Sequence, residues 1–519
     1  MSLEGATAPT PQASLHAEET RSSLRHGTTG VKEWRAVYDE GIARAIEARD
    51  LLGLTRLAVT AAVRLDAEGL HHTAIEQLRV AEEKCRGLPE ASALLNSWLA
   101  AFEALAGRPD AAQRSLERSP QAQVWGASSL EIEANRLAVR ILALDPNVGD
   151  DVIDRIAFSQ QEGRDWAASS LLSWYIPSLL AMGRRARAEA WTEELRASSV
   201  AVGHPWRQVD AATFTYANSL ALRQTADLPT EVELAESKNV NARWRLHCLA
   251  LREATLRTQW IEAREEIARL DLIAPELGPG FVDGSWLFSA FIAAMRGDED
   301  EASPPVPDHL SLMNLGAVLA GMEAVAVAGR QSVAVEWLRW VDGHLPKEVE
   351  TALEWPVSAA RVRGLLMARA GDIQGGTVAL REGVRWAKNA GYVVEQALGE
   401  VQLAELLAHG GRTARRSSWD RLRRDGAAVL HGLGLEPILP AYLVTRLVAL
   451  SRSEDHTPLT PREVEVLSAL AKGSTYKEAG LALDISWRTV RVHVTHVYDK
   501  LDVSRKIEAV RVGRELGII

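Results

Sequence analysis

The sequence predicts an all-α protein that consists of a long helical repeat array followed by a small helical module. Apolar residues recur at spacings of three and four along almost the whole chain, as in Leu94, Leu95, Trp98, Leu99 and Phe102. Alternating runs of Val, Ile and Thr, which would indicate strands, are nearly absent. Turn-like residues interrupt the helical pattern about every 38 residues, a period typical of stacked helix–turn–helix repeats.

The first 30 residues carry no helical pattern. Residues 1–30 are rich in Ala, Thr, Pro and Ser, and they lack a basic start followed by an apolar run. We therefore expect a disordered N-terminal segment that is not a secretion signal. The whole chain has 47% hydrophobic and 25% charged residues, as soluble proteins do, and we expect a cytoplasmic protein without a membrane partner.

Residues 31–450 are expected to form the repeat array. Several turns follow a short phrase such as Ala-Leu-Ala-Gly107 or Ala-Val-Ala-Gly329, in which the small residue permits close packing and the glycine is expected to supply a left-handed C-cap conformation. In these features the array resembles degenerate tetratricopeptide (TPR) repeats. The expected turns lie at Gly69, Gly107, Asp145-Pro146, Gly183, Gln224, Gln259, Gly297, Gly329, Gly371 and Gly411.

Tryptophans recur at related places in the array. Trp98 and Trp174 each lie nine residues before a turn glycine, which would place them at equivalent depths in two repeats. They are either core filler between helices or the aromatic lining of a concave ligand groove. On the second interpretation, the candidate effector contacts are Trp98, Trp174 and Trp286.

Three further segments stand out. Residues 296–309 are acidic and Pro-rich, which predicts an exposed loop between helices. Leu310 to Gly329 is the most apolar stretch, and Glu323 within it favours a buried helix over a membrane span. Residues 451–458 are polar without an apolar period, which predicts a linker between domains.

From Leu459 onward the helix signals become sharper. Thr460 to Glu463 predicts a helix start with a capping box, and Thr475 to Glu478 predicts a second one. Ser486 is the expected cap of a third helix that runs to about Leu501, and Ser504 that of a fourth. The first helix is expected to bury Val464, Leu467, Leu470 and Ala471.

The expected third helix separates two faces. Val490, Val494, Val497 and Leu501 share one apolar stripe. Two short helices, a three-residue turn and a third helix with a basic outer face predict a helix-turn-helix unit sized for the DNA major groove. The outer face carries Arg488, Arg491, Val492, Thr495 and Asp499.

Residues 459–519 resemble the four-helix LuxR-type DNA-binding domain of bacterial regulators. The family phrases are L-T-P-R-E-x-E-V-L, N-K-E-I-A and I-S-x-x-T-V-K-V-H-x-x-x-I-x-x-K-L. This chain reads LTPREVEVL from Leu459, YKEAG from Tyr476 and ISWRTVRVHVTHVYDKL from Ile485. It has Tyr476 for the usual Asn, Gly480 for the usual Ala and, directly after the third phrase, Asp502 for the usual Gly or Asn. A glycine inside a helix predicts a second helix weakened by up to about 1 kcal/mol.

The resemblance implies roles for individual residues. Arg491, Val492 and Thr495 would contact bases, with Arg491 suited to guanine and Val492 to a thymine methyl. Thr495 stands where some relatives have Lys, so one base preference stays open. The fourth helix would form a homodimer, although the module's own core is expected to take some of its apolar residues. The implied dimer contacts are Ile507, Val510, Val512 and Leu516, and the implied DNA backbone contacts are Lys477, Trp487, Arg488, Thr489, His496, Lys500 and Arg505.

Charge divides unevenly between the two parts. The chain has a net charge of −10, whereas Thr457–Ile519 carries 10 Lys+Arg against 8 Asp+Glu. An acidic array with a slightly basic module excludes a protein that coats nucleic acid along its whole length. It is compatible with one small DNA-binding surface.

We expect no enzymatic activity, cofactor or metal site. The phosphate-binding phrase G-x-x-x-x-G-K-[ST], the zinc phrase HExxH and the nucleophile phrase G-x-S-x-G are all absent from the sequence. Cys85 and Cys248 are far apart and form no CxxC pair. The chain resembles the C-terminal half of large ATP-dependent LuxR activators of the maltotriose-sensing type, without their ATPase.

Together these features predict a one-component transcription regulator. The TPR-like array would sense a small-molecule effector, and the module would bind double-stranded operator DNA as a dimer, with activation through RNA polymerase as the family default. Two alternatives stay open. A protein partner docked on the array could control the same module, or the chain could be a TPR scaffold with a vestigial DNA module.

Overall fold

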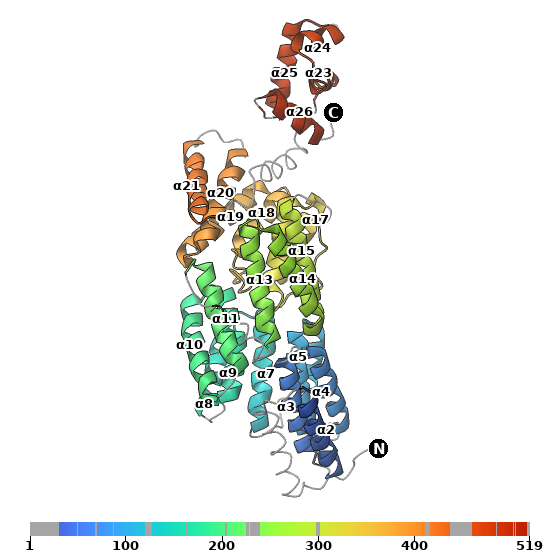
Figure 1. Ribbon diagram of the computed structural model, residues 1–519, viewed down its shortest axis with the longest axis vertical. Helices are drawn as coiled ribbons and strands as arrows, with labels where there is room; N and C mark the ends of the chain where they lie inside the picture. The colour runs from blue at the N-terminus through green and yellow to red at the C-terminus, as the bar shows by residue number, and fades with distance from the viewer. Residues whose placement is uncertain are drawn as a thin grey trace. The chain divides into compact units, whose positions relative to one another are not determined.

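The computed structural model of the chain confirms the all-α prediction in the part of the chain that it describes (Figure 1). Residues divide into two compact units, Met1–Val448 and Ala449–Ile519. The predicted disordered segment 1–30 and the predicted linker 451–458 lie outside the described residues. The structure describes residues 31–48, 50–67, 70–86, 88–119, 127–161, 165–202, 205–224, 228, 239–296, 302–409, 416–435, 459–483, 485–501, 503, 505–515 and 519.

The first unit is the helical array. Its first half consists of α2 (Val31–Glu47), α3 (Leu51–Ala67), α4 (His71–Cys85), α5 (Pro89–Leu105), α6 (Pro109–Glu117), α7 (Ala127–Leu142), α8 (Gly149–Gln161), α9 (Asp165–Ala181), α10 (Arg185–Val202) and α11 (Pro205–Ala221). Its second half consists of α13 (Val240–Leu256), α14 (Trp260–Leu277), α15 (Pro279–Arg296), α16 (Leu315–Ala328), α17 (Gln331–His344), α18 (Ala359–Arg369), α19 (Ile373–Ala390), α20 (Val393–His409) and α21 (Arg416–Gly432).

The first half of the array has two layers. Helices α3, α5, α7, α9, α11 and α13 pack side by side in one layer. Helices α4, α6, α8 and α10 pack on that layer, each against a neighbour in the chain. This alternation is the arrangement that a helix–turn–helix repeat produces, because each hairpin buries its apolar stripe against the next one.

One turn geometry recurs at eight places in the described part of the array, and at five of them the central residue is a glycine: Gly107, Gly183, Gly371, Gly391 and Gly434. At Gly107, Gly183 and Gly371 the backbone takes positive φ values of 75°, 67° and 107°. In each turn the N–H of the residue with positive φ donates to the carbonyl oxygen three residues before it. The N–H of the following residue donates to the carbonyl oxygen five residues before that following residue.

Glycine suits this left-handed conformation because it has no Cβ. The same turn is built by non-glycine residues at Leu144, Arg223 and Thr258. The left-handed conformation expected at Gly329 is wrong, because this glycine ends its helix in extended backbone with a φ of −68°.

The turns of the first half contact the second half of the array. The N–H of Leu312 donates to the carbonyl oxygen of Leu142 at 2.8 Å, and the N–H of Glu350 donates to that of Ala181 at 2.7 Å. Helices α4 and α14 also touch. Figure 1 shows the two halves as the blue-to-green and the green-to-orange helices. We call this set of contacts between turns and the second half the turn seam.

The described part of the predicted exposed loop at 296–309 joins two helices as expected, but only Pro305 and Asp308 in residues 302–309 are exposed. Ala302 and Pro304 are buried, and the carbonyl oxygen of Pro304 accepts a hydrogen bond of 2.8 Å from Trp337 Nε1. His309 packs against Gly107 at the turn seam. Although the segment is acidic and Pro-rich, it is partly covered by contact partners from distant parts of the array.

The apolar stretch from Leu310 to Gly329 forms α16, and every residue of this helix is buried. Its one carboxylate, Glu323, takes part in a buried ion network. Arg361 donates to Glu395 Oε2 and to Glu323 Oε1, both at 2.7 Å, and Arg252 donates to the same two carboxylates at 3.3 Å. Burial alone would raise the pKa of Glu323, but the two guanidinium groups lower it below its usual value. The network therefore links α13, α16, α18 and α20 through ionised groups.

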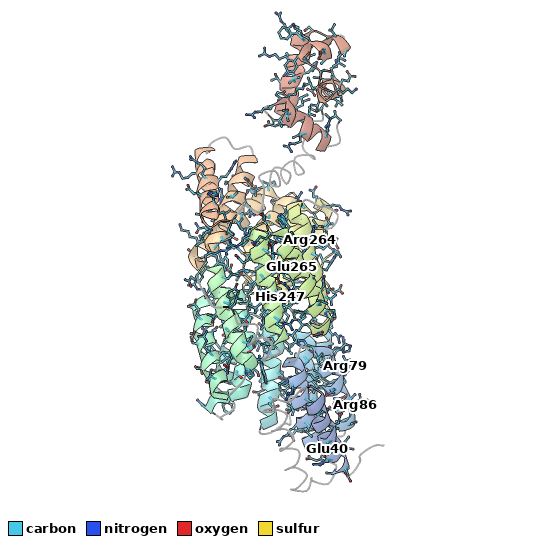
Figure 2. All side chains as sticks on the ribbon, viewed as in Figure 1. Glu40, Arg79, Arg86, His247, Arg264 and Glu265 are labelled. Carbon is cyan, nitrogen blue, oxygen red and sulfur yellow. The ribbon has the colours of Figure 1, made fainter. Side chains whose placement is uncertain are left out.

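Charged side chains cover the outside of the array (Figure 2). Glu40 on α2, Arg79 on α4 and Arg86 directly after α4 are exposed and form ion pairs with neighbouring side chains. Within the described residues, no helix is both long and apolar enough to cross a membrane.

The second unit contains four helices in its described residues. They are α23 (Pro461–Ala471), α24 (Tyr476–Ala482), α25 (Trp487–Leu501) and α26 (Lys506–Glu515). Helix α25 packs against each of the other three. Helix α23 does so too, so these two helices together form the centre of the unit.

Candidate nucleic-acid interface

Both predicted capping boxes are formed in the second unit. Thr460 accepts a hydrogen bond from the N–H of Glu463, and the Glu463 carboxylate accepts one of 2.7 Å from the N–H of Thr460. Thr475 and Glu478 repeat the arrangement at the start of α24. Each box satisfies backbone donors that a helix start would otherwise leave without a partner. The two short helices are thereby fixed at their first turns.

Helix α23 buries a slightly different set of residues from the predicted one. Leu467 and Leu470 are buried as expected, whereas Val466 lies in the core and Val464 is only half-buried. The helix contacts α24, α25 and α26, so its buried surface is wider than a single stripe. Glu463 is also buried, which the sequence pattern did not indicate.

Gly480 allows the turn after α24 to approach the helix closely. A Cβ atom at this position would lie 2.7 Å from the carbonyl oxygen of Ile485. The N–H of Ile485 in turn donates to the carbonyl of Gly480 at 2.9 Å. The glycine therefore has a packing role in this chain, in addition to the lower helix propensity expected from the sequence.

Helix α25 separates a buried and an exposed face as predicted. Its buried stripe consists of Val490, Val494, Val497 and Leu501. On the opposite face Arg491, Val492 and Thr495 are exposed, and Val492 keeps 52% of its surface accessible. The Thr495 hydroxyl donates to the main-chain carbonyl of Arg491 at 3.0 Å. The three predicted base-reading residues thus form one continuous outward surface.

Several predicted backbone contacts flank this surface. Lys477, Arg488, His496 and Arg505 are exposed. The guanidinium of Arg488 lies 5.6 Å from the ring centre of Trp487, which is itself 42% exposed. Such a cation–π contact holds the positive charge at the start of α25. Thr489 is exposed, but its hydroxyl lies 2.8 Å from that of Ser486, whose side chain caps the helix as predicted.

Lys500, a predicted DNA backbone contact, forms an ion pair inside the module. Its Nζ donates to Glu463 Oε2 at 2.7 Å, and its side chain is only 27% exposed. Burial alone would raise the pKa of Glu463, but hydrogen bonds from Lys500 and Thr460 lower it below its usual value. The ion pair joins the last turn of α25 to the first turn of α23.

The sequence reasoning missed two other basic side chains that join elements of the module. Arg462 donates to the carbonyl oxygen of Leu483 and to Glu465 Oε2. Lys506 donates through Nζ to the carbonyl oxygen of Ser474 at 2.9 Å. Both carbonyls lie where a helix has ended, at the places where unpaired backbone acceptors are found.

The predicted dimer contacts divide into two groups. Ile507 is 82% exposed on α26. Val510 and Val512 are partly buried against the module's own core, so the homodimer assignment is weakened for these two residues. Leu516 lies outside the described residues, as does the side chain of Asp499. His493 is half-buried.

The predicted effector residues also divide. Trp98 and Trp174 are both buried and line one cavity of about 50 Å³ between α3, α5, α7, α9 and α11. Asn135, Ser170 and Arg207 add polar groups to its wall. Trp286 is 45% exposed on α15 and does not line this cavity. Trp98 and Trp174, which share a repeat position, therefore line the same cavity, whereas Trp286 does not.

Residues 457–512 match the family described as bacterial regulatory proteins, luxR family. The transcriptional regulatory protein YdfI of Bacillus subtilis is 33% identical over 120 residues, which cover 23% of this chain and 56% of that protein. LiaR of the same organism, also a transcriptional regulatory protein, is 46% identical over 54 residues, which cover 10% of this chain and 26% of LiaR. The quorum sensing-dependent regulator RpaR of Rhodopseudomonas palustris is 37% identical over 108 residues, 18% of this chain and 44% of RpaR.

The second unit is therefore a LuxR-type DNA-binding domain, in agreement with the sequence prediction. The relatives that share it are transcription regulators. The chain spans less than two thirds of the length of each of these relatives.

Proposed function

We propose that this protein is a sequence-specific DNA-binding transcription regulator whose helical array controls the LuxR-type domain. The observation that carries the proposal is the division of α25 into a fully buried valine stripe and an exposed face with Arg491, Val492 and Thr495. A helix held in this way can enter a major groove with its outer face against the base edges.

The formed capping boxes argue against the alternative of a scaffold with a vestigial module. A domain that no longer bound DNA would be free to lose Thr460, Thr475 and the exposed Arg491. All three are present, and both threonines cap their helices.

The test is binding by the full chain to duplexes selected from a random-sequence library. Arg491→Ala should weaken binding to the selected site about 5- to 150-fold, the range expected for a bidentate contact to guanine. Arg114→Ala on α6 removes an equal charge from an exposed site of the array and should leave binding unchanged. Unchanged binding by Arg491→Ala would contradict the proposal.

We further propose that a small molecule binds the cavity that Trp98 and Trp174 line. The present volume of about 50 Å³ is well below the roughly 300–1,000 Å³ of ordinary ligand sites. Binding therefore requires a tryptophan side chain to turn and the surrounding helices to shift. Such a shift gives a ligand different affinities for two arrangements of the array, which is the condition for controlling DNA binding.

Thermal unfolding of the full chain against a metabolite panel tests this second proposal. A ligand that stabilises the native chain but not the Trp174→Leu variant supports it. Trp286→Leu is the matched control, because Trp286 lies outside the cavity, and it should keep the ligand effect. If every stabilising compound acts equally on both variants, the effector site is elsewhere and control by a protein partner becomes the better hypothesis.

A homodimer on DNA and activation through RNA polymerase remain part of the proposal. The exposed Ile507 supports the dimer, since an isolated apolar side chain on α26 would be covered by a second copy. Activation follows from the family resemblance alone, and a reporter gene placed behind the selected site tests it.

A further inference from the structure

A groove of about 380 Å³ lies between α4 and α6, two helices of the same layer of the array. Both helices pack on α5, which forms the floor of the groove. Asn96, Leu99 and Glu103 are spaced by three and four residues, so they share the stripe of α5 that faces the groove. Two of these three residues are polar although α5 is almost wholly buried. The volume is within the range of roughly 300–1,000 Å³ that small-molecule sites occupy.

The floor of the groove carries a hydrogen-bond acceptor that lacks a donor. Asn96 is only 1% exposed. Its Nδ2 donates to the main-chain carbonyl of Ser92 at 2.9 Å, whereas its Oδ1 accepts no hydrogen bond from any residue that the structure describes. A buried acceptor without a donor costs stability, and native proteins rarely keep one without a reason. A ligand with a hydroxyl group at the floor would supply the missing donor.

Arginine side chains from both walls line the groove. They include Arg79 on α4, Arg86 directly after α4 and Arg118 directly after α6. Figure 2 shows the first two on the outside of the array. Arg118 is exposed and forms no ion pair with another residue in the described ranges. Guanidinium groups bind phosphate through paired N–H donors, so these walls suit a phosphate group.

Glutamates of the groove do not cancel its positive charge. Glu103 on the floor is buried, and its carboxylate is shared by Arg79 and by Arg108 outside the groove. The carboxylate of Glu82 lies 3.4 Å from Nε of Arg86. Counted with Arg108, the arginines outnumber the glutamates. The groove therefore attracts an anion rather than a cation.

We propose that this groove binds a small phosphate monoester that also carries hydroxyl groups, such as a sugar phosphate. Arg86 and Arg118 bind the phosphate group from the two walls, and a ligand hydroxyl donates to Asn96 Oδ1 on the floor. The bound molecule would tie α4 to α6 across α5. This site goes beyond the proposed function, since it lies on the face of α5 opposite to Trp98 and is separate from the DNA-binding domain.

Isothermal titration calorimetry of the full chain tests the ligand class. The probes are glucose 6-phosphate, ribose 5-phosphate and glycerol 3-phosphate, with inorganic phosphate and glucose for comparison. At least one ester should bind about fivefold or more tightly than inorganic phosphate, because its hydroxyl pairs with an acceptor that is otherwise unsatisfied. Glucose alone should not bind. If no ester binds more tightly than inorganic phosphate, the proposal is wrong.

Two variants and a control locate the binding site. Arg118→Gln should weaken binding of both the ester and inorganic phosphate about tenfold, the lower end for a charged hydrogen bond because the groove is open to water. Arg187→Gln on α10 removes an equal charge from an exposed position outside the groove and should leave both affinities unchanged. Asn96→Ala should remove only the advantage of the ester over inorganic phosphate.

The exposed Arg118 keeps the test decisive even if Asn96→Ala does not fold. Equal affinities of Arg118→Gln and the native chain would place the ester elsewhere and overturn the proposal. Selection of DNA duplexes by the native chain without any ester is a separate measurement. A failure of ester binding therefore leaves the proposed function intact, and a failure of duplex selection leaves this groove intact.

Discussion

Lys500 Nζ and Glu463 Oε2 lie 2.7 Å apart, so the helix that carries the base-reading residues is fastened to the capping box of α23. The carboxylate accepts from Lys500 and from the N–H of Thr460 at the same time. One side chain thereby satisfies a helix start and orients α25. The arrangement makes the stability of the DNA-binding domain sensitive to the charge of a single glutamate.

Acidification should loosen α23 through Glu463. The folded pKa of this residue is lower than its usual value. Its contribution to stability is therefore present above the pKa of the unfolded chain, about 4.3, and is lost as pH falls through the lower folded value. Hydrogen exchange of the amides in residues 461–471 should accelerate over this pH interval in the native chain. In Glu463→Gln these amides should exchange faster already at neutral pH, because the loss of the cap lowers the stability of α23 by about 0.5–2 kcal/mol. Their exchange should then show no further acceleration over the acidic pH interval. Glu465→Gln, at a more exposed site, should behave as the native chain; equal effects of the two would contradict the assignment.

Lys477 and Lys500 should affect DNA binding in different ways. Lys477 is exposed, and Lys500 is paired with Glu463. Removing a lysine that contacts a phosphate lowers the slope of log affinity against log salt by about 0.9. Lys477→Ala should show this change without loss of stability. Lys500→Ala should lower stability and leave the salt slope close to the native value. A reduced slope for Lys500→Ala alone would restore the role first expected from the sequence.

Replacing Gly364 or Gly343 of the array by alanine should change the free energy of unfolding in opposite directions. In Gly364 on α18, a Cβ atom would lie 2.7 Å from the backbone nitrogen of Leu380 on α19. Gly364→Ala should destabilise the array by about 1–3 kcal/mol because the two helices would have to separate. Nothing lies within 4 Å of a Cβ at Gly343 on α17, so Gly343→Ala should stabilise by up to about 1 kcal/mol. Denaturant unfolding of both variants checks the contrast, and the same sign for both would refute the close approach.

The buried ion network should make Arg361 far more sensitive than its neighbour Arg363. Arg361 has no exposed surface and binds two buried carboxylates, whereas Arg363 pairs with Asp342 at the surface. Arg361→Met should cost about 3–5 kcal/mol, because Glu323 and Glu395 would lose the nearer of their two shared arginine partners and keep only Arg252. Arg363→Met should cost less than about 1 kcal/mol. The midpoint of denaturant unfolding of the array measures both, and comparable shifts would mean that the network carries no special weight.

Ile507 should matter for paired sites on DNA. If α26 forms the dimer contact, Ile507→Asp should weaken binding to a duplex with two half-sites and leave binding to one half-site unchanged. Leu481→Asp changes a similarly exposed apolar residue on α24 and serves as the control. The ratio of the two affinities, measured by gel shift, separates dimer loss from direct loss of DNA contact.

Local signals in the sequence predicted much of the structure. The capping boxes at Thr460 and Thr475 and the stripe from Val490 to Leu501 depend on residues a few positions apart, and all are present. The expected turn positions at Asp145, Gln224 and Gln259 fell one residue after the residue with positive φ. The residue type could not predict which position takes the positive φ, because Leu, Arg and Thr do not favour a left-handed conformation. The residues that take it are Leu144, Arg223 and Thr258.

Contacts between distant residues escaped the sequence reasoning. Lys500 and Glu463 are separated by 37 positions, and no periodicity connects them. The segment from Ala302 to His309 resembles surface by composition, yet Pro304 binds Trp337 and His309 lies against Gly107, so part of the segment is buried. For Trp98 and Trp174 the sequence left open whether they fill the core or line a ligand groove. Equal depth in a repeat does not say which side of the helix faces a cavity, and in the structure both tryptophans are buried and line the same small cavity.

The turn seam has a consequence for how the array folds. In an ordinary solenoid each repeat touches only its neighbours, so the chain can be shortened by whole repeats and can fold from any starting point. Here the carbonyls of Leu142 and Ala181 bind amides that follow about 170 residues later in the chain. Pairing over such separations slows folding and joins both halves in one cooperative transition. Truncation after α11 should therefore leave the first half with exposed turn acceptors, and the array should be inherited and exchanged between proteins as one indivisible piece.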